Sequence, residues 1–336
     1  MFWRIYEYPR IGLFTKPTPL EKLENYSREY GVSLYVKRDD VMEIGFGGNK
    51  ARKLEFILGD ALKHGADIVI TRGSYYSNHV RLTAIAAAKH GLKTVIVTYP
   101  PHENARYSVQ GNILLYKLAG AEVVTAKNSQ EADKLMEEIA EEYRRKGHNP
   151  YIIPVGGSSP HGVLGYVDAV HELLLQFRDM DTKPDTIVLA TGTGTTQAGL
   201  ILGLKLLGVR GVRVIGVDIE GVSEGVIENR VMELIEKTAD MIGAGIRVSE
   251  DDVNVLRGYS FGGYGKFNRE LLEFIIGVLK REGLLLEPVY TGKAFYALRD
   301  MIEKGEVKRG EKIVFIHTGG TPLVFQFAEE FGELVR

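Results

Sequence analysis

The stretch "TIVLATGTGTTQAG", residues 186–199, joins a run of aliphatic and β-branched residues to a turn rich in glycine and threonine. The run at 186–190 is typical of a buried parallel strand, and a helical pattern begins near Thr196. Glycines let the backbone approach an anion closely, and free N–H groups at a helix start bind it. This stretch therefore predicts a strand–loop–helix unit with a phosphate site, although a glycine-rich turn capped by threonines fits the same letters.

Short strands and helical patterns alternate along the rest of the chain. Strands are also predicted at 33–39, 67–71, 94–98, 122–125, 151–155, 212–218 and 312–317. Helical patterns are predicted at 81–90, 105–118, 129–146, 161–177 and 268–281. This alternation predicts an α/β fold with mostly parallel sheets. A chain of 336 residues is long for a single core and suggests two domains.

The composition excludes several kinds of protein and site. The 42 basic and 44 acidic residues nearly balance, which gives no electrostatic case for a nucleic-acid or anionic-membrane partner. Cysteine is absent, which excludes disulfides, zinc–thiolate sites and a cysteine nucleophile, and no metal site is predicted. No run approaches the ~20 apolar residues of a membrane span. The start, "MFWRIYEYPR", lacks the apolar run of a signal peptide, so we expect a cytoplasmic protein.

The loops after four predicted strands share one composition. These loops are "RGSYYSNHVR" (72–81), "GGSSPHG" (156–162), "TGTGTTQAG" (191–199) and "TGGTP" (318–322). Ligands of open parallel sheets bind beside the carboxyl ends of the strands, where such loops meet. We therefore expect the four loops to converge on one site.

A second unusual stretch is "GGNKARKLE", residues 47–55. Gly47 and Gly48 permit a tight bend, and Asn49 is a good cap for a helix that starts at Lys50. A cation at the positive end of a helix loses its proton more easily, as Schiff-base chemistry requires. A solvent-facing helix start is the plain alternative. Combined with a phosphate loop, a reactive lysine suggests pyridoxal 5′-phosphate, which offers an aldehyde and a phosphate.

Two other functions remain open from these residues. "GTGTTQAG" approximates the dinucleotide motif G-x-G-x-x-G, and Asp218 ends the next strand, where a ribose ligand lies in such folds. That reading leaves Lys50 and "SNH" without roles. A non-catalytic protein that carries pyridoxal phosphate is the other alternative.

Several motifs together resemble those of the 1-aminocyclopropane-1-carboxylate deaminase/D-cysteine desulfhydrase family, pyridoxal-phosphate enzymes of the tryptophan-synthase-β fold group. They are, in order, "GGNKARKLE", "SNHVR", "GGSS" with "GVLGY", "TGTGTTQAG", "GGYG" and "EPVYTGKA". The resemblance implies two three-layer αβα domains (fold type II): a large one at 1–53 and 166–336, and an inserted small one at 54–165. It also implies a homodimer and a small amino-acid substrate.

The resemblance also implies roles for individual residues. Lys50 would form the Schiff base with Lys53 as a helper, and Ser77 would bind the substrate carboxylate or handle protons. The cofactor would contact Asn78, Thr193, Gly194, Thr195, Thr196, Thr291 and Thr318, and the substrate would face Tyr264 and Tyr290. Plainer readings are a helix cap at Ser77, Asn78 and His79, and core packing for both tyrosines. His79 is read as structural.

Two positions favour one reaction within the family. Members that open the cyclopropane ring have glutamate at the position of Thr291 and leucine at that of Thr318, whereas the desulfhydrase side resembles this chain. The predicted reaction is therefore αβ-elimination from D-cysteine, with D- or L-serine as further substrates and ring opening as the alternative. Lys50 would be the base, and Tyr264 or Tyr290 would protonate the leaving thiolate. The family has glutamine directly before "SNH", whereas this chain has Tyr75 and Tyr76, which are expected to narrow the pocket or to alter which amino acid fits.

Overall fold

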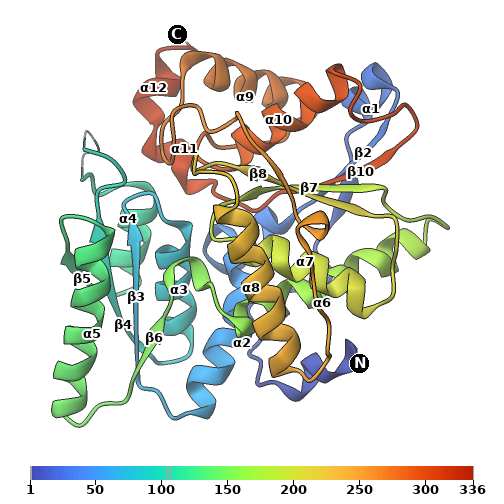
Figure 1. Ribbon diagram of the computed structural model, residues 1–336. Helices are drawn as coiled ribbons and strands as arrows, with labels where there is room; N and C mark the ends of the chain where they lie inside the picture. The colour runs from blue at the N-terminus through green and yellow to red at the C-terminus, as the bar shows by residue number, and fades with distance from the viewer. Residues whose placement is uncertain (1, 104, 106, 336) are drawn as a thin grey trace.

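The computed structural model describes residues 2–103, 105 and 107–335, whose strands form two sheets (Figure 1). The six-stranded sheet has the order β1-β2-β10-β7-β8-β9. Its strands are β1 (Leu20–Lys22), β2 (Ser33–Lys37), β7 (Thr186–Thr191), β8 (Arg213–Asp218), β9 (Asn254–Leu256) and β10 (Lys312–Ile316). Only β1 runs antiparallel to its neighbour within this sheet as described.

The four-stranded sheet is wholly parallel, in the order β5-β4-β3-β6. Its strands are β3 (Ile68–Ser74), β4 (Lys93–Tyr99), β5 (Glu122–Thr125) and β6 (Pro150–Ile153). All four come from one continuous part of the chain, between two parts that build the larger sheet.

Helices cover both faces of the six-stranded sheet (Figure 1). One face carries α6 (Pro160–Arg178), α7 (Thr195–Leu206) and α8 (Val226–Met241), and the other carries α1 (Glu24–Tyr30), α9 (Arg269–Glu282) and α10 (Thr291–Glu303). The strands alternate between these two cores, as the two-residue period of a strand requires. In β7, for example, Ile187 and Leu189 pack toward α6 and α7, whereas Val188 packs toward α9 and α10.

The four-stranded sheet is covered in the same way. One face carries α2 (Asn49–Lys63), α3 (Asn78–Lys89) and α4 (Gly111–Leu118), and the other carries α5 (Ser129–Arg145). The remaining short helices are η1 (Phe2–Glu7), η2 (Asp39–Val41), η3 (Ile44–Phe46), η4 (Val155–Gly157), η5 (Glu250–Asp252), α11 (Pro322–Gln326) and α12 (Ala328–Gly332). Among the described residues, no helix is long and apolar enough to cross a membrane.

Helix α2 crosses α6 where the two sheet systems meet. At the crossing, a Cβ atom on Gly165 would lie 2.3 Å from the carbonyl oxygen of Arg52, so only glycine allows this approach. The start of α2 is therefore held against the larger sheet system, while the rest of the helix packs on the smaller sheet.

A buried ion network fixes the same end of α2. Arg52 is fully buried and donates hydrogen bonds to Asp39 at 2.7 and 2.9 Å and to Glu172 at 2.9 and 3.1 Å. Lys37 lies 2.5 Å from Glu172, and Tyr166 donates to Asp39 at 2.6 Å. The solvent-facing alternative for "KARK" is therefore wrong, because its arginine is an internal anchor.

Most predicted elements are confirmed to within a few residues. Of the segment predicted as a helix at 105–118, residues 111–118 are helical and 107–110 are not, while residue 106 lies outside the described residues. A Cβ on Gly111 would lie 2.8 Å from the carbonyl oxygen of Pro322, so this segment runs close against α11. The short strands β1 and β9 carry no apolar run and were not predicted. The division at residues 54 and 165 stays a prediction, since α2 and α6 continue across those positions.

Candidate active site

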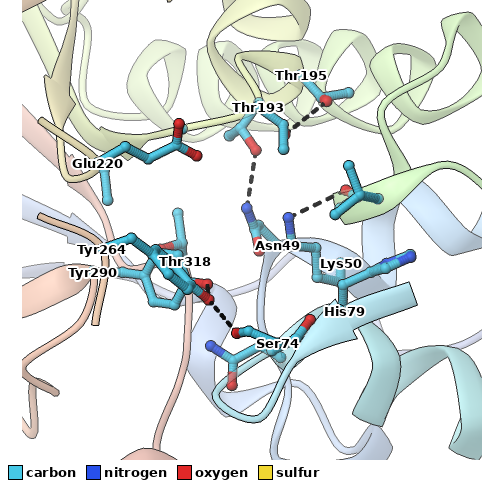
Figure 2. Close-up of a pocket in the computed structure, with 18 of the residues that line it drawn as sticks. Asn49, Lys50, Ser74, His79, Thr193, Thr195, Glu220, Tyr264, Tyr290 and Thr318 are labelled. Carbon is cyan, nitrogen blue, oxygen red and sulfur yellow. Dashed lines mark hydrogen bonds between the residues drawn. The ribbon is translucent and has the colours of Figure 1, made fainter. Parts of the chain in front are cut away.

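A cavity of about 300 Å³ lies between the two sheets, at the carboxyl ends of their strands (Figure 2). Each of the four glycine-rich loops predicted to converge contributes to its lining. Ser77 comes from the loop after β3, Gly156 from the loop after β6, Thr193 from the loop after β7 and Thr318 from the loop after β10. The predicted convergence is therefore confirmed.

The start of α2 is built by glycines against the loop after β10. Gly48 has φ +114°, and a Cβ there would lie 2.8 Å from the carbonyl oxygen of Thr318. The next N–H, that of Asn49, donates to this same oxygen at 3.0 Å. Asn49 was predicted as the helix cap, which is wrong: it is the first helical residue, and its amide donates to Thr196 Oγ1 at 2.9 Å. Asn49 thus links α2 to α7 across the cavity.

Two lysine amines share one acceptor in the cavity wall. Lys50 Nζ and Lys53 Nζ donate to the carbonyl oxygen of Gly156 at 3.2 and 3.4 Å. Burial lowers the pKa of Lys50 to about 8. Burial and the neighbouring charge of Lys50 hold the pKa of Lys53 well below its usual range. A neutral amine, the form that attacks an aldehyde, is therefore available near neutral pH.

His79 lies beside these amines and carries no charge. Burial, with the charges of Lys50 and Lys53, holds its pKa well below the ordinary value. Its Nε2 atom is 2.9 Å from Thr71 Oγ1. The ring lines the cavity wall as a neutral, hydrogen-bonded group, in keeping with the structural role that we predicted.

The loop after β7 forms an anion cradle. Gly194 has φ +79° and precedes α7 without any side-chain cap, so the first N–H groups of that helix are free for a ligand. The hydroxyls of Thr193 and Thr195 lie 3.3 Å apart beside it. Thr191 also lines the cavity, and its buried hydroxyl has no hydrogen-bond partner among the described residues. The free N–H groups at the start of α7, with these hydroxyls beside them, would fit a phosphate group.

The wall opposite Lys50 carries a chain of hydroxyls (Figure 2). Ser74 Oγ lies 3.1 Å from the Tyr264 hydroxyl, which lies 2.6 Å from the Tyr290 hydroxyl. Burial raises the pKa of both phenols, so both hold their protons at neutral pH. Lys293 fixes the loop before Tyr264 by donating to the carbonyl oxygens of Ser260 and Gly263 at 2.7 and 2.9 Å.

Ser77, Asn78 and Thr318 complete the predicted set at the cavity surface. Ser77 also caps α3, since its hydroxyl accepts the N–H of Val80 at 3.4 Å, so the plainer reading of this residue holds as well. Asn78 Oδ1 accepts a hydrogen bond from Asn112 at 3.0 Å. The roles of Ser77, Asn78 and Thr318 toward a ligand remain predictions.

Three predicted contacts point away from the cavity. Thr291 is fully buried, and its hydroxyl binds the Glu287 carboxylate at 3.1 Å, so the structure does not bring this residue to the site. Tyr75 stacks edge-on against Tyr107, and Tyr76 packs against Phe327. The prediction that these tyrosines narrow the pocket is therefore wrong, because their rings fill an apolar cluster instead.

The cavity residues that sequence reasoning did not single out include Ser74 and Glu220. Both lie at the carboxyl ends of parallel strands, β3 and β8, which is the position that singled out the other loops. The loop after β8 was passed over because it lacks a run of glycine, serine and threonine. Among the described residues, no group of three histidines, aspartates or glutamates could hold a metal ion.

Comparison with known proteins gives consistent matches over almost the whole chain. The family described as "Pyridoxal-phosphate dependent enzyme" matches residues 11–319. A Pyrococcus abyssi protein named "Putative 1-aminocyclopropane-1-carboxylate deaminase" is 46% identical, over 98% of this chain and 96% of its own. A Yersinia enterocolitica protein named "D-cysteine desulfhydrase" is 39% identical, over 96% and 97%. A crystal structure described as "ACC deaminase homologue" is 44% identical with a TM-score of 0.89, over 99% of this chain and 98% of its own.

Proposed function

Because the chain belongs to the pyridoxal-phosphate-dependent enzymes, within the 1-aminocyclopropane-1-carboxylate deaminase/D-cysteine desulfhydrase family, we propose that it catalyses αβ-elimination from a small amino acid. D-cysteine is the first substrate of this proposal, and pyruvate, sulfide and ammonium are the products. The observation that carries it is that the Lys50 amine lies on one wall of the cavity and a chain of protonated hydroxyls lies on the opposite wall. Elimination needs a base at Cα and an acid at the group leaving Cβ.

The residues of the cavity fit the cofactor of this family. Thr193, Gly194, Thr195 and Thr196 would hold its phosphate at the start of α7, and Lys50 would hold its aldehyde carbon. Asn78 and Thr318 would contact the ring, with Lys53 beside Lys50 as a neutral helper. When bound there, pyridoxal 5′-phosphate supplies an aldehyde that joins the substrate amine and a ring that withdraws electrons from Cα.

The side chains then divide the proton transfers. Ser77, at the positive end of α3, would orient the substrate carboxylate. The Lys50 amine would take the proton from Cα, because burial keeps part of it neutral. Tyr264 or Tyr290 would give a proton to the departing sulfur, and Ser74, hydrogen-bonded to Tyr264, would support that transfer. Water completes the release of pyruvate and ammonium.

Ring opening of 1-aminocyclopropane-1-carboxylate is the second candidate, favoured by the name of the Pyrococcus abyssi relative. We would incubate the purified protein in parallel with D-cysteine, L-cysteine, D-serine, L-serine and 1-aminocyclopropane-1-carboxylate. Sulfide and pyruvate from D-cysteine are the expected products. Release of 2-oxobutanoate from the cyclopropane, without sulfide from D-cysteine, would replace the proposal by its alternative.

Thr318→Leu should slow elimination. Thr318 faces the cavity, whereas Thr291 does not, so of the two positions Thr318 is the one to change. The proposed contact of Thr318 with the cofactor ring is one hydroxyl hydrogen bond, and its loss costs about 0.5–1.5 kcal/mol. This cost corresponds to a roughly 2- to 12-fold fall in kcat/KM for D-cysteine. Thr318→Ser keeps the hydroxyl and should retain most of the rate. Equal losses of kcat/KM in both variants would mean that the shape of the side chain at position 318, and not a hydrogen bond from its hydroxyl, affects the rate.

The rate at which the cofactor-free protein captures pyridoxal 5′-phosphate should rise with pH through about 8. The neutral amine is the nucleophile, and burial lowers the pKa of Lys50 to about 8, so its neutral fraction grows across that range. The visible absorption of the bound cofactor gives the rate by stopped flow. A rate that rises only near the pKa of a free lysine, roughly 10.4, would contradict this assignment of Lys50.

We also propose a homodimer and a cytoplasmic location, both in keeping with the family. Light scattering of the purified protein checks the first, since a dimer has twice the mass of the 37.4 kDa chain. The separation of residues 54–165 as a small domain is likewise proposed, and limited proteolysis near its boundaries tests it.

A further inference from the structure

Glu220 is the one carboxylate among the described residues that line the cavity. It lies in the loop after β8, and Figure 2 shows its carboxylate directed into the cavity on the side that also carries the two tyrosines. Arg230 of α8 donates to Glu220 Oε2 at 2.9 Å and to the carbonyl oxygen of Gly192 at 3.1 Å. The other oxygen lies over the cradle, since a Cβ on Gly192 would be 2.6 Å from it.

The loop that carries Glu220 is held rigidly. The Asp218 carboxylate accepts the N–H groups of Glu220, Gly221 and Val222 at 2.8, 2.9 and 3.2 Å. These hydrogen bonds hold the backbone at Glu220, so the Glu220 carboxylate enters the cavity from a fixed position.

The charge of Glu220 acts on the groups proposed to react. It opposes the burial that lowers the pKa of Lys50. It adds to the burial that raises the pKa of Tyr264 and Tyr290. A group that acts electrostatically on both walls also acts on a substrate between them.

Glu220 also lies where the cavity opens into a neighbouring groove of about 480 Å³. Tyr99, Ser129, Val155 and Thr193 line both spaces together with Glu220. Glu220 therefore lies on the boundary between the groove and the cavity that holds Lys50. The groove also holds three cationic side chains, Arg72, Arg230 and Lys237, and a second carboxylate, Glu233, which lines only the outer space.

We propose that Glu220 selects substrates by the charge of the group on Cβ, favouring a β-ammonium or a neutral hydroxyl or thiol over a β-sulfonate. The proposal rests on the proposed function, because it concerns the same site. A fixed negative charge in a partly desolvated cavity attracts a cation and repels an anion. With 2,3-diaminopropionate, the Cα proton goes to Lys50 and the Cβ–N electron pair leaves with the amine. Water then gives pyruvate and a second ammonia, so no oxidant is needed.

The test compares kcat/KM for 2,3-diaminopropionate, serine and cysteate, each as both enantiomers. Glu220→Gln should lower the preference for the cationic over the anionic substrate by roughly tenfold. Arg230→Gln should raise that preference, because it removes the neighbouring positive charge. Glu233→Gln is the matched control: its exposed carboxylate pairs with Lys237 outside the cavity, so the preference should not change.

Calorimetric dissociation constants for 2,3-diaminopropionate and cysteate separate this proposal from the proposed function. If no amino acid is turned over, but Glu220→Gln still shifts the ratio of the two constants, charge selection stands and elimination fails. If neither the kinetic nor the binding ratio changes in Glu220→Gln, charge selection is overturned whatever the activity. The same shift in Glu233→Gln would also overturn it, by showing a general surface effect.

Discussion

Replacement of Lys50 by alanine should lower pyruvate formation from D-cysteine by about 10²–10⁴-fold, the usual contribution of a positioned acid or base. Lys50 combines a lowered pKa with a place between the anion cradle and the hydroxyl wall. Reduction with borohydride should attach the cofactor covalently to the native chain at Lys50. In Lys50→Ala, no stable adduct should form.

The control for this experiment is Lys53→Ala. Lys53 shares the Gly156 carbonyl oxygen with Lys50 but is almost entirely buried, so its amine is less open to a ligand than that of Lys50. We expect this variant to retain the borohydride adduct at Lys50, with a changed pH dependence because a neighbouring amine is gone. An adduct at Lys53 in the Lys50→Ala protein, with full turnover, would refute the assignment.

The largest expected effect on stability comes from Asp39→Ala, which should lower the free energy of unfolding by about 3–5 kcal/mol. Asp39 is fully buried and accepts hydrogen bonds from Arg52, Tyr166 and Thr18. Its removal leaves the Arg52 guanidinium short of one of its two carboxylate partners inside the protein. Urea unfolding followed by circular dichroism gives the change, and Asp240→Ala, which breaks an exposed pair with Arg247, should change the free energy of unfolding far less.

A double variant separates charge from packing in this network. Asp39→Leu together with Arg52→Met removes both members of the pair and fills similar space, and it should be more stable than Asp39→Ala. If Asp39→Ala costs no more than the surface variant, the network does not hold the start of α2 as we describe.

The sequence predicts the layers and the convergence of the loops well, for a physical reason. Parallel strands buried on both faces need unbroken aliphatic runs, and such runs are visible in the letters of β7 and β10. The lysine at 50 was recognisable because glycines before it mark a chain that must bend. The short edge strands β1 and β9 have no comparable pattern, since pairing with a neighbour alone makes them strands.

Side-chain direction was the part that could not be predicted. Thr291 and Thr318 both stand in motifs that resemble those of the family, yet only Thr318 faces the cavity. The Thr291 hydroxyl instead donates a hydrogen bond to the Glu287 carboxylate. Tyr75 and Tyr76 precede Ser77 directly, but their partners in the apolar cluster lie far along the chain. Glu220 carries no motif at all, and its importance follows from its position after β8.

The path of the chain at the α2–α6 crossing has a mechanical consequence. The chain enters the smaller sheet through α2 and leaves it beside Gly156, and at that exit Lys50 and Lys53 bind the Gly156 carbonyl oxygen. Both connections between the two sheet systems thus meet beside the Lys50 amine. A rotation of the smaller sheet about this point would swing Ser77 and its loop while Lys50 stays nearly still, and it would shear the packing of Tyr76 on Phe327. The cavity would then change its width around a nearly stationary Lys50 amine.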